Sequence, residues 1–151
     1  MFTKCPKCGY QEIEENIYYQ RGKRYEGLKL GKSKTSMQNY GCHLMAWSYA
    51  AQMDPIEVNK LFIENGVYNY DMIISEKAAK ALNLKWIGKF IDINYMPKQE
   101  ITIKEVRLGK GQHFVVRINK DGKRTIFDPW EGKVLPINYY PFKSYRVIEK
   151  K

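Results

Sequence analysis

Three side chains in this sequence have the types that a cysteine nucleophile requires. Cys42 follows Gly41 and opens an apolar run that is typical of a buried helix. The first turn of a helix has unpaired amide N–H groups and the positive end of the helix dipole, so it favours the thiolate, which is the nucleophilic form. His113 and Asp128 follow later, as a candidate base and orienting acid. A lone cysteine before a helix is more often a buried structural residue, so its partners decide the interpretation.

A predicted hairpin turn sets the positions of His113 and Asp128 relative to each other. Asp121-Gly122 is a favoured two-residue turn pair, and it predicts that Lys120 faces Lys123. In that register Val115 faces Asp128. The candidate histidine shares a strand face with Val115, because side chains alternate along a strand. Asp128 is then a diagonal neighbour of His113, roughly 5–8 Å away. A one-residue slip in the register would turn Asp128 to the other face of the sheet.

The elements that must position these residues form two blocks, with helices first and strands after them. Helical patterns cover residues 43–53, a segment from the N-cap Asp54 to the C′ residue Gly66, and a short segment capped by Ser75. Period-two patterns predict strands at residues 86–91, 100–107, 112–118, 124–128 and 145–148. Helices followed by an antiparallel sheet indicate an α+β fold.

Composition is that of a globular domain. The 151 residues are 44% hydrophobic and 14% aromatic, which is enough for a real core. No apolar run approaches the ~20 residues of a membrane-spanning helix. The N-terminus lacks the apolar segment of a signal peptide, so we expect a protein that is cytoplasmic as synthesised. A form that acts on cell walls would be virion-associated or released on lysis.

The chain is strongly basic, with a formal net charge of +10. Such a charge favours anionic partners, for example nucleic acid, teichoic-type polymers or membrane surfaces. The basic residues are scattered, however, and a solvated lysine-rich surface explains them better than a dedicated nucleic-acid patch. A basic nucleic-acid-associated protein is therefore a minor alternative.

Cys5 and Cys8 form a separate motif, Cys5-Pro6-Lys7-Cys8-Gly9, of the type that zinc ribbons use. We expect residues 1–16 to be a knuckle or arm preceding a domain at 17–151. A tetrahedral structural zinc site needs four ligands, and the sequence contains no second pair. A zinc half-site completed by another chain, a reversible dithiol and a relic turn remain as alternatives. The thiol chemistry itself would require no cofactor.

Taken together, the motifs resemble those of papain-like cysteine peptidases. The resemblance rests on Gly41-Cys42 entering a helix, on the strand His113-Phe114-Val115-Val116, and on the corner Phe127-Asp128-Pro129-Trp130. It is strongest to the bacteriocin-processing (double-glycine) peptidase-like group, with its phage and peptidoglycan-hydrolase-like members. This resemblance implies a papain-like fold, with N-terminal helices packed on a C-terminal antiparallel sheet. It also implies a triad of Cys42, His113 and Asp128.

The same resemblance implies a glutamine that stabilises the oxyanion. Gln38 lies shortly before Cys42 but fits the family spacing only loosely. Gln20 opens a segment that precedes Leu28-Lys29-Leu30-Gly31, as in relatives with a longer lead-in. We therefore expect Gln20 and the backbone N–H of Cys42 to be the oxyanion donors, and we interpret His43 as a flanking residue.

The leading hypothesis is a thiol hydrolase that cleaves a peptide or amide bond through an acyl-enzyme. A peptidoglycan stem peptide and a protein precursor are the candidate substrates. The alternative is a catalytically silent papain-like structural or adaptor protein of a larger assembly such as a phage particle, whose partners would be other virion proteins. The reactivity of Cys42 distinguishes the two.

Overall fold

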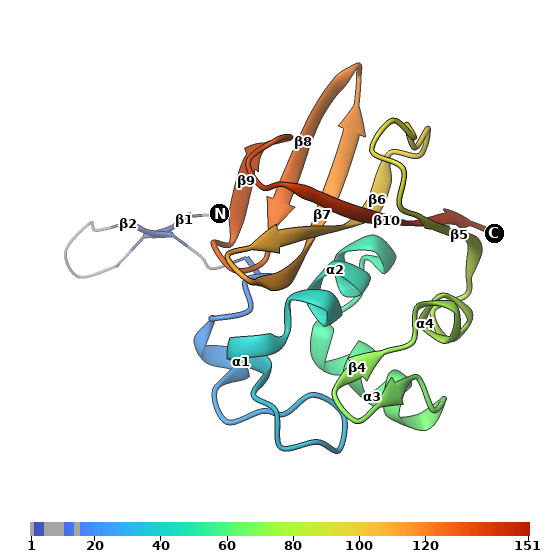
Figure 1. Ribbon diagram of the computed structural model, residues 1–151. Coiled ribbons are helices and arrows are strands. Elements are labelled where there is room, and N and C mark those ends of the chain that lie inside the picture. The colour runs from blue at the N-terminus through green and yellow to red at the C-terminus, as the bar shows by residue number, and fades with distance from the viewer. Residues whose placement is uncertain (1, 5–10, 14–15) are drawn as a thin grey trace.

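A six-stranded antiparallel sheet with helices against one face forms the body of the protein (Figure 1). The structure is a computed structural model that describes residues 2–4, 11–13 and 16–151. The strand order is β5-β10-β6-β7-β8-β9, so the last strand of the chain lies between β5 and β6. The strands are β5 (Leu84–Phe90), β6 (Ile101–Leu108), β7 (Gly111–Lys120), β8 (Lys123–Asp128), β9 (Lys133–Pro136) and β10 (Phe142–Lys150). The α+β prediction is confirmed at this level.

The helices precede the sheet in the chain, as expected. They are the short 3-10 helix η1 (Lys23–Tyr25), α1 (Met37–Tyr40), α2 (Cys42–Ala51), α3 (Pro55–Glu64) and α4 (Ser75–Ala81). Helix α2 packs on β6 and β7, while α4 packs on β5. Two small hairpins pair β1 (Phe2–Lys4) with β2 (Gln11–Ile13) and β3 (Tyr68–Asn69) with β4 (Met72–Ile73).

The turn between β7 and β8 has the predicted chemistry. Asp121 and Gly122 both have positive φ, 53° and 77°, which is the conformation of a type I′ hairpin. Lys120 pairs with Lys123, and the ladder continues to Val116 opposite Phe127. The predicted register is therefore confirmed.

Helix α3 also begins and ends as its sequence indicates. The Asp54 carboxylate accepts a hydrogen bond from the backbone N–H of Ile56 at 2.9 Å, and Gly66 beyond the C-terminus has a φ of +62°. The assignment of Ser75 as a cap is wrong, because Ser75 is the first residue of α4 and Ile74 is the N-cap. The Ser75 hydroxyl instead accepts a hydrogen bond from Arg146 Nε at 3.2 Å. A charged donor from the sheet thus uses the oxygen that would have capped the helix.

Several short elements have no counterpart in the sequence prediction, among them α1, β9 and the β3–β4 hairpin. Each is only two to four residues long, which is too short for a hydrophobic period to develop. Strand β9 follows a turn at Gly132, where φ is +70°, and it extends the sheet beyond β8.

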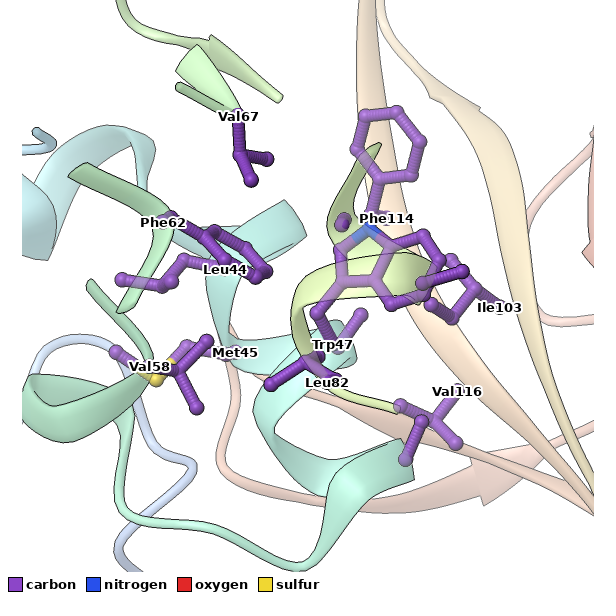
Figure 2. Packing of buried hydrophobic residues seen from close by; sticks show 14 of the residues in the cluster. Leu44, Met45, Trp47, Val58, Phe62, Val67, Leu82, Ile103, Phe114 and Val116 are labelled. Carbon is purple, nitrogen blue, oxygen red and sulfur yellow. The ribbon is translucent and has the colours of Figure 1, made fainter. Parts of the chain in front are cut away.

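The main core lies between α2 and the sheet (Figure 2). Leu44 and Trp47 of α2 are fully buried against Ile103, Phe114 and Val116 of the sheet. The opposite sheet face has a second, smaller cluster, built on Val106, Val115, Ile126 and Tyr140. Because side chains alternate along a strand, β7 supplies residues to both clusters.

Cys5 and Cys8 lie outside the described residues, so the knuckle, its zinc and the division at residue 16 stay predictions. Across residues 16–151, no three His, Cys, Asp or Glu side chains are grouped as a metal site would require. None of the helices that the structure describes has the length and apolarity needed to cross a membrane.

Candidate active site

Cys42 is the first residue of α2, and Gly41 precedes it as N-cap. A glycine is required where φ is positive or where another part of the backbone approaches closely. The φ of Gly41 is −85°, so the second reason applies. A Cβ atom at Gly41 would lie 2.3 Å from the carbonyl oxygen of Met37, far inside a van der Waals contact. As the first helical residue, Cys42 has a backbone N–H with no intrahelical acceptor.

His113, near the start of β7, contacts both other members of the proposed triad. Its Nε2 atom lies 2.6 Å from Oδ1 of Asp128. Cys42 lines the same cleft as His113 and lies close enough to raise the pKa of the imidazole. Because Nε2 meets the carboxylate, Nδ1 is the ring nitrogen left for a further partner. The His113 and Asp128 side chains are 4% and 0% exposed. The structure thus brings together the three residues that the sequence selected.

The Asp128 carboxylate is held by two further donors that the sequence did not reveal. The backbone N–H of Trp130 donates to Oδ1 at 2.9 Å, and the hydroxyl of Tyr140 donates to Oδ2. Burial alone would raise the pKa of Asp128, but the hydrogen bonds from His113 and Tyr140 outweigh it and lower that pKa. Asp128 is therefore an anion with a set orientation.

The charge state of His113 follows from the same contacts. Burial disfavours the imidazolium, but the hydrogen bond with Asp128 and the nearby Cys42 side chain outweigh burial and raise the pKa of His113 to about 9. A protonated His113 held by the Asp128 carboxylate can donate a proton at neutral pH.

Gln20 reaches the same site from the segment before η1. It is 1% exposed, and its backbone N–H donates to the carbonyl of Pro129 at 3.0 Å, directly beside Asp128. Its side-chain Nε2 donates to the carbonyl of Gln38 at 3.1 Å, which leaves one amide proton for another acceptor. The Gln38 amide instead donates to the carbonyl of Gly22 at 3.1 Å, so Gln38 holds the segment that contains Gln20.

A cleft of about 570 Å³ connects these side chains. Gln20, Cys42 and His113 all line it, between the α1 region and the sheet. Apolar and aromatic side chains, among them Leu30, Ile73, Phe114 and Trp130, form part of the lining. Four charged lining residues, Lys89, Glu105, Lys143 and Arg146, come from three strands of the sheet. The volume lies in the ordinary range of ligand sites.

The charged part of the cleft is organised around Glu105, which is 2% exposed. Its carboxylate accepts from Arg146 Nη1 at 2.8 Å and from the Ser144 hydroxyl at 2.7 Å, and Lys143 Nζ lies 3.3 Å away. Burial opposes ionisation, but the hydrogen bonds and the charge of Arg146 lower the pKa of Glu105 to about 2. Sequence reasoning missed this cluster, because alternation along β6 gives no sign that a glutamate faces inward.

His43 forms part of the cleft wall. Its ring stacks on Phe114 with centroids 3.7 Å apart, and its Nε2 accepts a hydrogen bond from Trp47 Nε1 at 2.9 Å. Burial and the charge of Arg146 lower the pKa of His43 well below its ordinary value. A neutral, stacked ring agrees with the interpretation of His43 as a flanking residue.

No family model, curated protein or solved structure matches this chain. The papain-like fold and the peptidase activity therefore stay expectations that rest on motif resemblance. The structure shows an α+β fold, with Cys42 and His113 lining one cleft and Asp128 buried behind His113.

Proposed function

We propose that this protein is a thiol hydrolase of papain-like architecture that cleaves a peptide or amide bond. One observation supports it above all others. Cys42 at the start of α2 lines the same cleft as His113, and Nε2 of His113 meets the buried Asp128 carboxylate at 2.6 Å. A nucleophile, a base and an orienting group in this order are the parts that covalent acyl transfer needs.

In the first half of the reaction, the Cys42 thiolate attacks the carbonyl carbon and forms a tetrahedral oxyanion. The His113 imidazolium then gives its Nδ1 proton to the leaving amine, the C–N bond breaks, and a thioester remains on Cys42. In the second half, neutral His113 takes a proton from water, and the resulting hydroxide attacks the thioester. Collapse releases the carboxylic acid and restores the thiolate–imidazolium pair. Asp128 stays ionised and keeps the ring oriented throughout.

The oxyanion would be bound by two N–H groups. One is the backbone N–H of Cys42, which has no acceptor within α2. The other is the remaining amide proton of Gln20, whose side chain lines the cleft. Donors that folding has already oriented need no reorganisation during the reaction, so they stabilise the transition state more than the ground state.

The substrate would be a peptide segment, from a peptidoglycan stem peptide or a protein precursor. A cleft of about 570 Å³ accommodates several atoms on each side of a scissile bond. The net charge of +10 favours approach to an anionic cell wall. A protein acting there would reach the wall within a virion or on lysis.

The decisive experiment is alkylation of Cys42 by iodoacetamide at pH 6. The Cys5→Ser/Cys8→Ser variant is used, because the chain has three cysteines and this variant leaves Cys42 alone. We expect Cys42 to react faster than N-acetylcysteine, since an ordinary thiol with a pKa near 8.5 is almost wholly protonated at that pH.

The matched control is the same variant with His113→Ala, in which the rate should fall toward that of the free thiol. If Cys42 in the unmutated site reacts no faster than N-acetylcysteine, the hydrolase proposal is rejected. The silent adaptor hypothesis then takes its place.

A further inference from the structure

A second hollow, of about 360 Å³, lies on the sheet face that points away from the helices. It shares no lining residue with the active-site cleft. Three cationic side chains line it, Lys104, Arg117 and Arg124, and among the described residues no Asp or Glu does. We call this hollow, defined by those three residues, the cationic pocket.

The strand register places these cations together. Lys104 on β6 pairs with Val115 on β7, so Arg117, two residues further along β7, is on the same face. Arg117 pairs with Ile126 on β8, and Arg124 is two residues from Ile126. This is the face of the smaller hydrophobic cluster, opposite α2. Three neighbouring strands thus each direct one cation toward one hollow.

Two of the cations are buried, and no acidic side chain of the described residues pairs with either. Lys104 is 3% and Arg117 is 2% exposed. Lys104 Nζ donates to the carbonyl of Ile137 at 3.0 Å, and Arg117 Nη1 donates to the carbonyl of Pro97 at 3.1 Å. Within residues 16–151, neither has a carboxylate at ion-pair distance. Most of their N–H donors therefore have no protein acceptor among the described residues.

Buried charges without counter-ions are costly. Burial and the nearby charge of Arg117 both lower the pKa of Lys104, and burial lowers the pKa of Arg117. If the two side chains served only to tether the loops at Pro97 and Ile137, neutral donors would do so at lower cost. An anion in the pocket would relieve the repulsion and use the remaining donors.

We propose that the cationic pocket binds a phosphate group, either free or as a small phosphomonoester. Three cations with no lining carboxylate suit a dianion better than a singly charged carboxylate. The arginine guanidinium matches the oxygens of a phosphate in a two-pronged geometry. Phe142 and Tyr145, with ring centroids 4.8 Å apart, line the same hollow and offer an apolar surface for the remainder of an ester.

The test is calorimetric titration of the full chain with inorganic phosphate, with adenosine monophosphate and with adenosine, at constant ionic strength. We expect saturable binding of phosphate or adenosine monophosphate and none of adenosine. Tighter binding of the monophosphate identifies an ester as the ligand, and equal affinity identifies the free anion. Absence of saturable binding of both at about 1 mM, a very weak affinity, overturns the proposal.

Site specificity is tested with variants. Lys104→Met should raise the dissociation constant roughly tenfold or more, since it removes a buried charged donor. Arg124→Gln, at an exposed position that is safe for folding, should raise it several-fold. Lys60→Gln on α3 removes the same charge elsewhere and should leave it unchanged. If Arg124→Gln and Lys60→Gln weaken binding equally, the anion is held only by the general positive charge, and the proposal fails.

Discussion

His113 Nε2 lies 2.6 Å from Asp128 Oδ1 in a contact from which solvent is almost excluded. The carboxylate therefore acts on the imidazole without screening by water. It sets the ring orientation and leaves Nδ1 as the ring nitrogen available to a further partner. Because Tyr140 and the Trp130 backbone hold Asp128 in turn, the orientation of the base depends on residues well beyond the triad.

Asp128→Asn should slow both hydrolysis and the alkylation of Cys42 at pH 6. The amide keeps the shape of the carboxylate but removes the charge that stabilises the imidazolium, so hydrolysis should slow roughly 10²–10⁴-fold. Alkylation should slow toward the rate of an ordinary thiol, by at most about 300-fold at pH 6. The rate is measured with iodoacetamide on the Cys5→Ser/Cys8→Ser background. Asp121→Asn is the control, because asparagine suits the positive φ of 53° at that turn. Equal rates for the two variants would contradict the role of Asp128.

The stability of the protein should fall as the pH rises through the titration of His113. Its pKa is about 9 in the folded state, against an ordinary value of 6.5. The folded state therefore binds more protons between those values, and the stabilisation is complete below pH 6.5 and lost by about pH 9. Urea unfolding at several pH values measures it, with His113→Gln as the reference. The free-energy gap between the two proteins should narrow from pH 6 to pH 9, and a constant gap would exclude the shifted pKa.

Gln20→Ala should separate catalysis from thiol reactivity. Hydrolysis passes through an oxyanion, and the variant lacks the Gln20 amide that would donate to it, so kcat should fall roughly 10²–10³-fold. Alkylation by iodoacetamide forms no oxyanion, so the Cys42 rate should stay within about two-fold of the parent. A parallel loss in both assays would mean that Gln20 supports the structure of the site and does not bind the oxyanion.

Gly41→Ala should destabilise the protein by about 1–3 kcal/mol, because the added methyl would overlap the Met37 carbonyl and force α1 and α2 apart. Cys42 would move with α2, so its alkylation should slow as well. Gly111→Ala is the matched control, since the nearest heavy atom to its new Cβ would be 3.6 Å away. Urea unfolding of both variants measures the difference, and similar stabilities would refute a steric need for Gly41.

Local chemistry in the sequence determined the order of the elements and the candidate triad. The Asp121-Gly122 turn specifies its own backbone geometry, and alternation along β7 and β8 then places His113 and Asp128 on one face. The Asp54 cap likewise depends only on adjacent residues. Such signals act over a few positions, so they can be interpreted without knowledge of the tertiary structure.

Only the tertiary structure decided which polar residues are buried and what they contact. Tyr140 meets Asp128 because a loop before β10 returns across the sheet, and Glu105 faces Arg146 because β10 inserts beside β6. The burial of Lys104 and Arg117 has the same origin. In a strand of alternating pattern, a lysine or glutamate is expected to face solvent. Pairing with a strand from a distant part of the chain can bury that side chain instead. Contacts between residues far apart in the chain have no local pattern, so they appear only when the sheet is assembled.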